Sequence, residues 1–279
     1  MSVELVRDLP RPLAFVFPGG GALGAYQVGV LRALAERDVT ADLLVGVSAG
    51  ALNAAFVAWS PGLDGLAALE RVWRSVRRRD LLRVHPGRLA LAFTGRRASF
   101  LDSRHGAEWV TRTIGWRMIE HAPTRLAVVA TDVTTGRAVP ITKGDVVSAI
   151  VGSAAFPGVY PPVWRDGRWL MDGGVVADVP LDITAGLGAA SAVVLSVPAL
   201  AEGPPRLRAI DLLFRASTFG VEAHGRTVLA RPPDGLATVE IPARPSPVTT
   251  FAVGDAARMI DEGRLAATAW LDGAEAAVR

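Results

Sequence analysis

The chain has 279 residues, of which 50% are hydrophobic and 20% are charged, so it can bury a sizeable core and is not disordered as a whole. Its formal net charge is only +3, and the pI of about 10.1 comes almost entirely from arginine because Lys143 is the single lysine. With no cysteine, the chain has neither a disulfide framework nor a thiolate metal site.

The N-terminal residues do not have the pattern of a secretory signal peptide. Glu4, Arg7 and Asp8 precede any apolar run, whereas a signal has a positive start and an uninterrupted apolar stretch. Two uncharged runs, 13–31 and 43–63, are long enough to cross a bilayer. Both contain proline and several glycines, so we interpret each as a strand, a loop and a helix in a buried core. A cytoplasmic protein, or one bound peripherally to a membrane, is expected.

The predicted elements begin with a repeated strand and helix. Residues 13–17 and 43–47 are short, continuously apolar runs, as expected of strands covered on both faces. Helical patterns follow them at about 22–37 and at 49–59. This order predicts parallel pairing through a right-handed crossover, and hence a three-layer α/β/α fold with a mainly parallel central sheet.

An arginine-rich segment occupies the next part of the chain, residues 66–106. Nine arginines lie within 71–97, interleaved with tryptophan, leucine and phenylalanine, and few acidic residues balance them. Three roles are open: a cap over the active site, contact with an anionic membrane surface through 71–97, or a solvated helical face. Nucleic acid is not an expected partner, because no recognised motif accompanies the basic segment.

The α/β pattern resumes after this segment. Strands are expected at 126–131, 138–141, 192–197 and 236–241, and helices within 207–232 and 254–277. Residues 163–164 and 168–171 flank Asp166-Gly167, a pair that favours a two-residue hairpin loop. We find no internal repeat and no linker, so residues 1–279 are expected to form a single domain.

The second strand ends in a nucleophile-elbow pattern, Gly46-x-Ser48-x-Gly50. This sharp turn needs small residues around the serine, an apolar strand before it and a helix after it, and all three are present. The helix N-terminus adds a positive dipole beneath the hydroxyl. The pattern predicts Ser48 as a catalytic nucleophile; the alternative is a tight structural turn.

The glycine-rich loop after the first strand, Gly19-x-Gly21-x-x-Gly24, matches a dinucleotide-binding fingerprint. A dinucleotide site also needs an acidic residue at the end of the second strand, but Ser48 lies there and Asp42 lies at the opposite end. No Gly-Lys-Ser/Thr follows, as a P-loop would require. A nucleotide-binding protein that uses 19–24 as a phosphate cradle is kept as the competing class.

The position of the loop favours an oxyanion hole instead. The ends of neighbouring parallel strands emerge at the same edge of a sheet. Backbone N–H groups of Gly20, Gly21 and Ala22 are therefore expected near Ser48, where they can stabilise a tetrahedral oxyanion.

The general base has several candidates. Of the four histidines, only His224 follows the plausible acids in the chain order of α/β-hydrolases, and it lies in a predicted helix with no strand end to present it. Asp172 comes directly after a short strand and before two glycines, where it either points into a cleft or forms an Asx turn. Asp132 and Asp178 are further carboxylates, at turn or cap positions.

Three blocks together, Gly19-Gly20-Gly21-x-x-Gly24, Gly46-x-Ser48-x-Gly50 and Asp172-Gly173-Gly174, resemble those of patatin-like phospholipases. The stretches VVATDVTTGRAV and GSAAFPGVYPPV are also similar to the family, and the resemblance covers about residues 13–185. It implies a patatin-like fold and a lipid acyl hydrolase of phospholipase A, lysophospholipase or esterase type. A non-catalytic lipid-binding relative is the remaining alternative.

The resemblance also implies the roles of individual residues. Ser48 would be the nucleophile and Asp172 the base of a Ser-Asp dyad, and the oxyanion hole would comprise Gly19, Gly20, Gly21 and Ala22. Leu23 stands where many members have arginine or lysine, which bears on substrate range.

A Ser-Asp dyad has one physical requirement. A carboxylate with a pKa near 3.9 is a poor acceptor for a serine proton, so the site must raise the pKa of Asp172 by removing water. Apolar neighbours on both sides of Asp172 suit this: Trp169, Leu170, Met171, Val175 and Val176. The expected substrate is a lipid or another ester, and the chemistry calls for no metal and no organic cofactor.

Overall fold

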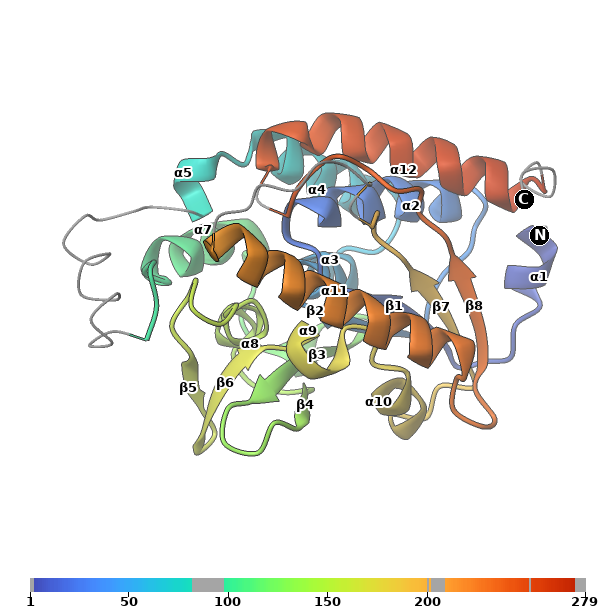
Figure 1. Cartoon of the computed structure of the whole chain (residues 1–279). Helices are drawn as coiled ribbons and strands as arrows, with labels where there is room; N and C mark the ends of the chain where they lie inside the picture. The colour runs from blue at the N-terminus through green and yellow to red at the C-terminus, as the bar shows by residue number, and fades with distance from the viewer. Residues whose placement is uncertain (1–2, 82–97, 200, 202–208, 251, 274–279) are drawn as a thin grey trace.

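The computed structural model describes residues 3–81, 98–199, 201, 209–250 and 252–273 (Figure 1). A mixed sheet lies at its centre, with strand order β5-β6-β3-β2-β1-β7-β8 and with β4 paired to β3. The strands are β1 (Leu13–Phe17), β2 (Leu43–Val47), β3 (Arg125–Asp132), β4 (Ala138–Ile141), β5 (Val163–Arg165), β6 (Arg168–Asp172), β7 (Ser191–Leu195) and β8 (Ala237–Ile241).

The helices lie between these strands and at both ends of the described chain. The longer ones are α2 (Gly24–Ala35), α3 (Ala49–Trp59), α4 (Leu63–Ser75), α7 (Arg104–Ile114), α8 (Val146–Ser153), α11 (Ala209–Ala230) and α12 (Ala256–Leu271). The shorter ones are α1 (Val3–Arg7), α5 (Arg78–Leu81), α9 (Gly174–Ala177) and α10 (Leu181–Gly186), with 3-10 turns η1 (Gly21–Leu23), η2 (Ile119–His121) and η3 (Val253–Asp255).

The predicted three-layer architecture with a mainly parallel sheet is confirmed. Strands β3, β2, β1, β7 and β8 pair in parallel, whereas the pairs β3–β4, β3–β6 and β6–β5 are antiparallel. Alternate residues of one strand enter different cores: Phe15 and Phe17 of β1 pack with α2 and α12, while Val16 packs with α10 and α11. Figure 1 shows α2, α4 and α12 together on one side of the sheet, and α9, α10 and α11 on the other.

Most element bounds agree with the expectations from sequence. The strands at 13–17, 43–47 and 138–141, the helix at 49–59 and the hairpin around Asp166-Gly167 are confirmed. The third strand is longer than expected because Arg125 and Asp132 extend its pairing with β2 and β6. The two long uncharged runs form strand, loop and helix, and in the part of the chain that the structure describes no helix is long and apolar enough to cross a bilayer.

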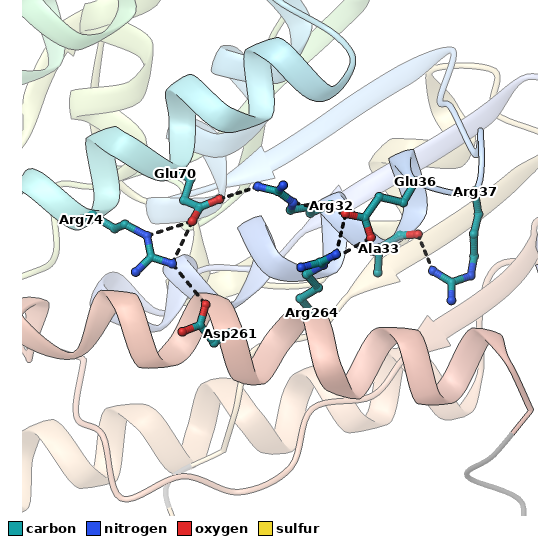
Figure 2. Close-up of polar contacts among 8 residues, drawn as sticks. All are labelled: Arg32, Ala33, Glu36, Arg37, Glu70, Arg74, Asp261 and Arg264. Carbon is teal, nitrogen blue, oxygen red and sulfur yellow. Dashed lines mark hydrogen bonds and ion pairs between the residues drawn. The ribbon is translucent and has the colours of Figure 1, made fainter.

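Ion pairs join α4 to α2 and α12 on the side of the sheet away from α11 (Figure 2). Glu70 of α4 accepts from Arg32 at 2.9 Å and from Arg74 at 2.8 Å, and Arg74 also reaches Asp261 of α12 at 3.1 Å. A second pair links α12 to α2, between Arg264 and Glu36. These pairs are partly exposed, so each contributes at most about 1 kcal/mol and adds to the apolar packing that holds the three helices together.

The described part of the arginine-rich segment packs onto the core. Leu66, Leu69 and Trp73 of α4 are buried, and the Trp73 indole N–H donates to Asn53 Oδ1 at 2.8 Å. Arg74 is tied into the ion pairs of Figure 2. This part therefore belongs to one of the packed layers. The expected cap or membrane contact also depends on residues 82–97, which lie outside the described residues.

Candidate active site

Ser48 lies on a strained turn between β2 and α3. Its backbone has φ 53° and ψ −123°, a conformation that a residue with a side chain seldom adopts. Ser153 holds this turn in place: its hydroxyl accepts from the Ser48 N–H at 2.8 Å and donates to the Val129 carbonyl at 2.6 Å. The turn thus has the geometry that the nucleophile-elbow pattern predicts.

The glycines of the elbow are required by close backbone approach. A Cβ on Gly50 would lie 2.3 Å from the Phe17 carbonyl oxygen, and one on Gly46 would lie 2.6 Å from the Cα of Ala51. Phe17 is the last residue of β1, so Gly50 is where the elbow helix meets the strand that carries the glycine-rich loop. The glycines therefore bring the two predicted motifs together.

The Ser48 hydroxyl donates a hydrogen bond of 2.7 Å to Oδ2 of Asp172. Asp172 ends β6 and is only 5% exposed. Its other oxygen, Oδ1, accepts from the Gly174 N–H at 2.8 Å, and Thr131 donates to its carbonyl. The carboxylate is thus held by two donors with one oxygen aimed at the serine, although 124 positions separate the two residues in sequence.

Burial raises the pKa of Asp172 to about 6, against the opposing effect of the hydrogen bonds from Ser48 and Gly174. This is the direction that the sequence analysis expected from the apolar neighbours. A carboxylate with this pKa is charged at neutral pH and is a better proton acceptor than a solvated aspartate.

A second carboxylate, Asp178, lies next to the dyad. Its Oδ1 accepts from the Gly19 N–H at 2.8 Å. Burial raises the pKa of Asp178 to about 7; the bond from Gly19 opposes this, and the charges of Asp172 and Glu222 add to it. From sequence, Asp178 is expected at a turn or cap position, and nothing local connects it to a loop 159 positions earlier.

The glycine-rich loop lies beside Ser48, but two of its four predicted oxyanion donors are already bonded. The Gly19 N–H is bonded to Asp178, and the Ala22 N–H donates to the Thr250 carbonyl at 2.7 Å. The expectation of a free Ala22 N–H is therefore wrong. Within the described residues, the amides of Gly20 and Gly21 have no such partner, so they are the two available donors.

A buried polar network that the sequence analysis missed supports this loop. Gln27 donates to the carbonyls of Pro18 and Leu195, and Asn53 donates to the Gly24 carbonyl and to Gln27 Oε1. Gln27 and Asn53 are both fully buried. The sequence did carry a signal for this network, because Gln27 and Asn53 are polar residues within otherwise apolar helices. Side-chain amides that are buried in a protein core are almost always hydrogen-bonded.

The other candidates lie away from Ser48 or are bonded elsewhere. His224 is exposed on α11, and the position beside the Ser48 hydroxyl is occupied by Asp172. Asp132 accepts from the amides of Thr134 and Thr135, as a turn residue does. Asp42 bonds the Leu13 N–H and Arg11 at the opposite edge of the sheet, which does not suit a ribose contact near the glycines.

Comparison with known proteins gives matches over the part of the chain that contains Ser48 and Asp172. A family model described as Patatin-like phospholipase matches residues 15–185. An uncharacterised NTE family protein of Mycobacterium bovis is 33% identical over 198 residues, 71% of this chain and 52% of that protein. Neuropathy target esterase sws of Drosophila melanogaster is 28% identical over 187 residues, 66% of this chain and 13% of that protein. The chain spans about half the length of the first curated relatives that it matches.

Solved structures with a similar arrangement have low sequence identity. VipD from Legionella pneumophila is 14% identical with a TM-score of 0.46, and the match covers 95% of this chain and 67% of VipD. ExoU from the type III secretion system of Pseudomonas aeruginosa, solved in complex with SpcU, is 14% identical with a TM-score of 0.44, and the match covers 96% of this chain and 54% of that one.

Proposed function

Because the chain belongs to the patatin-like phospholipase family, we propose that it is a lipid acyl hydrolase that cleaves carboxylic esters through an acyl-Ser48 intermediate. The observation that carries the proposal is the 2.7 Å hydrogen bond from Ser48 Oγ to the buried Asp172, made from a strained elbow. A serine with an adjacent base of raised pKa, beside unpaired backbone N–H groups, is the arrangement that acyl transfer requires.

In the first half of the reaction, Ser48 Oγ attacks the carbonyl carbon of the ester while its proton passes to Asp172 Oδ2. The carbonyl oxygen becomes an oxyanion, for which the N–H groups of Gly20 and Gly21 are the proposed donors. Each such donor is typically worth about 10²- to 10³-fold in turnover. Asp172 then gives the proton to the departing alkoxide, which leaves as the alcohol.

In the second half, a water molecule attacks the acyl-Ser48 carbonyl and Asp172 takes its proton. The same two N–H groups hold the second oxyanion. The intermediate collapses to the free carboxylic acid as Asp172 returns the proton to Ser48 Oγ. One base therefore serves both halves, with no histidine.

The test is covalent labelling with a fluorophosphonate probe, together with hydrolysis of a short-chain p-nitrophenyl ester. Wild-type protein is expected to be labelled and active, and Ser48→Ala is expected to be neither. The matched control is Ser75→Ala, since Ser75 is an exposed serine whose hydroxyl donates to the Val72 carbonyl in its own helix. Equal labelling of Ser48→Ala and wild type would contradict the assignment of the nucleophile.

The two alternatives give different results in the same preparation. A nucleotide-binding protein would bind NAD or ATP saturably in calorimetry, and we expect no such binding because no acid faces the glycine-rich loop from the end of β2. A non-catalytic lipid-binding relative would bind lipid but show neither labelling nor ester hydrolysis.

A further inference from the structure

The hairpin of β5 and β6 exposes two tryptophans on neighbouring strands. Trp164 is 58% exposed and Trp169 is 46% exposed, and their rings meet edge to face with centroids 5.1 Å apart. Together with Arg137 and Arg168 they line an open hollow of about 620 Å³. We call these four residues the tryptophan hairpin surface. A single exposed aromatic side chain is ordinary, but adjoining exposed apolar side chains can mark an interaction site.

The strand register places this surface at the same edge of the sheet as the active site. Val47 is level with Val129, so Ser48 follows at the level of Ala130, which pairs with Asp172. Trp169 precedes Asp172 by three residues of an antiparallel strand, so it lies about 10 Å further out beyond that edge. Figure 1 shows β5 and β6 projecting from the sheet on the side away from α2 and α12.

The charge of the surface is positive. Arg137 and Arg168 are exposed, and within the described residues neither guanidinium makes a salt bridge. Asp166 pairs with Arg165, and Asp132, which lines the hollow and accepts from the amides of Thr134 and Thr135, contributes one negative charge against the two arginines, so the surface keeps a net positive charge. Ser48 and Asp172 do not line the hollow, so it is a surface beside the site and not the acyl pocket.

From this combination we propose that the tryptophan hairpin surface docks the protein onto an anionic phospholipid bilayer, with the Ser48 edge facing the lipid. Tryptophan favours the interface between headgroups and acyl chains, where its ring is apolar and its N–H meets water. Unpaired arginines beside it complement anionic headgroups. The proposal goes beyond the proposed function, because it concerns binding and not hydrolysis.

The experiment measures partitioning onto vesicles of phosphatidylcholine mixed with phosphatidylglycerol, and onto vesicles of phosphatidylcholine alone. All variants carry Ser48→Ala, so lipid stays intact and a failure of catalysis does not affect the result. Arg137→Gln with Arg168→Gln is expected to lower binding to the anionic vesicles about 25-fold, or about fivefold for each arginine, with little change on phosphatidylcholine. Trp164→Ala with Trp169→Ala is expected to lower binding to anionic vesicles at least about tenfold.

Matched controls lie at the opposite edge of the sheet. Trp59 is 44% exposed at the end of α3, where the Ala58 carbonyl meets Thr124 just before β3 begins. Arg231 is exposed in the connection between α11 and β8. Figure 1 shows that β8 lies at the opposite end of the sheet from β5 and β6. Trp59→Ala and Arg231→Gln are expected to bind vesicles as the parent does, with thermal melting used to confirm that every variant is folded.

Contact with an anionic membrane is also one of the roles open to residues 71–97, so binding by the parent alone does not identify the surface. The loss of binding in the hairpin variants is the decisive result. Three results would overturn the proposal: no binding of the parent to anionic vesicles, unchanged binding of both folded double variants, or an equal loss in the controls. Unchanged binding of the double variants would mean that the tryptophan hairpin surface does not bind lipid and is better interpreted as a binding site for another protein.

Discussion

The Asp178 carboxylate accepts a hydrogen bond from the Gly19 N–H at 2.8 Å, and it therefore joins the segment that follows Asp172, the proposed base, to the start of the glycine-rich loop. Gly19 precedes the two amides that remain available, Gly20 and Gly21. The space is tight, since a Cβ on Gly19 would lie 2.9 Å from Asp178 Oδ1. The position of the loop consequently depends on a residue that is outside the three recognised motifs.

We expect Asp178→Ala and Asp178→Asn to differ in kinetics. Alanine releases the Gly19 N–H and lets the loop shift, so kcat should fall about 10- to 100-fold with a smaller change in KM. Asparagine keeps an acceptor for Gly19 and should largely preserve kcat. Steady-state kinetics on a short-chain p-nitrophenyl ester test this, and equal losses in the two variants would show that the hydrogen bond is not what matters.

The pH profile of the wild type should report the raised pKa of Asp172. Asp172 must be deprotonated to act as base, so kcat/KM of the wild type should rise as the pH passes through about 6. Because the pKa of Asp178 is raised further, to about 7, Asp178 is still mostly protonated and uncharged at that pH, so Asp178→Asn should leave the inflection near 6. An inflection that moves to lower pH in Asp178→Asn would mean that Asp178 is charged while Asp172 titrates.

Asp172→Asn should abolish hydrolysis while leaving the fold intact. An amide cannot take the serine proton, and loss of a general base typically costs about 10²- to 10⁴-fold. Asp132→Asn is the matched control: it retains an acceptor for Thr134 and Thr135 and should keep its activity. If Asp172→Asn stays active and Asp132→Asn does not, Asp132 is the base; if both stay active, the base is His224 or another group.

Gly50→Ala should destabilise the protein by at least about 3 kcal/mol, because its Cβ would overlap the Phe17 carbonyl and nothing there can move without breaking the sheet. Gly106→Ala is the control, since among the residues that the structure describes no other part of the molecule would lie within 4 Å of a Cβ on Gly106 in α7. Alanine there should be neutral or stabilise the helix by up to about 1 kcal/mol. Urea unfolding of both variants measures the difference.

The raised pKa values of Asp172 and Asp178 predict how the free energy of unfolding depends on pH. Because the pKa values of Asp172 and Asp178 are higher in the folded state, at about 6 and about 7, than their ordinary value of 3.8, these groups favour folding most below pH 4. That contribution is lost as the pH rises through about 6 and then about 7. The free energy of unfolding of Asp178→Asn should therefore fall less between pH 4 and pH 8 than that of wild type; an equal fall in both would contradict the raised pKa of Asp178.

Much of the fold follows from patterns within short stretches of the chain. The apolar runs 13–17 and 43–47 are β1 and β2, and Asp166-Gly167 forms the predicted hairpin loop. Strand ends were less certain: Arg125 and Asp132 belong to β3 only because their partners on β2 and β6 continue the pairing. Local propensity specifies the interior of an element, and neighbouring strands decide where it ends.

The site could be predicted only in part for the same reason. Ser48 has a local signature, because a strained elbow needs small residues at fixed positions around it. Ser153 has none, and Gln27 and Asn53 stand out only as polar residues in apolar helices, since each of the three supports the site through a bond to a residue far away in sequence. The sequence also could not predict that the Gly19 and Ala22 amides are hydrogen-bonded, because their acceptors, Asp178 and Thr250, lie far away in the chain.

The sequence alone determined the layer architecture, the elbow at Ser48 and the family resemblance, because hydrophobic periodicity and turn chemistry act over a few residues. Only the tertiary structure decided that Asp172 meets Ser48, that Asp178 rather than solvent bonds Gly19, and that two of four predicted loop amides stay available. These outcomes depend on burial and on contacts between distant segments, which shift a pKa or occupy a donor only after the sheet has brought them together.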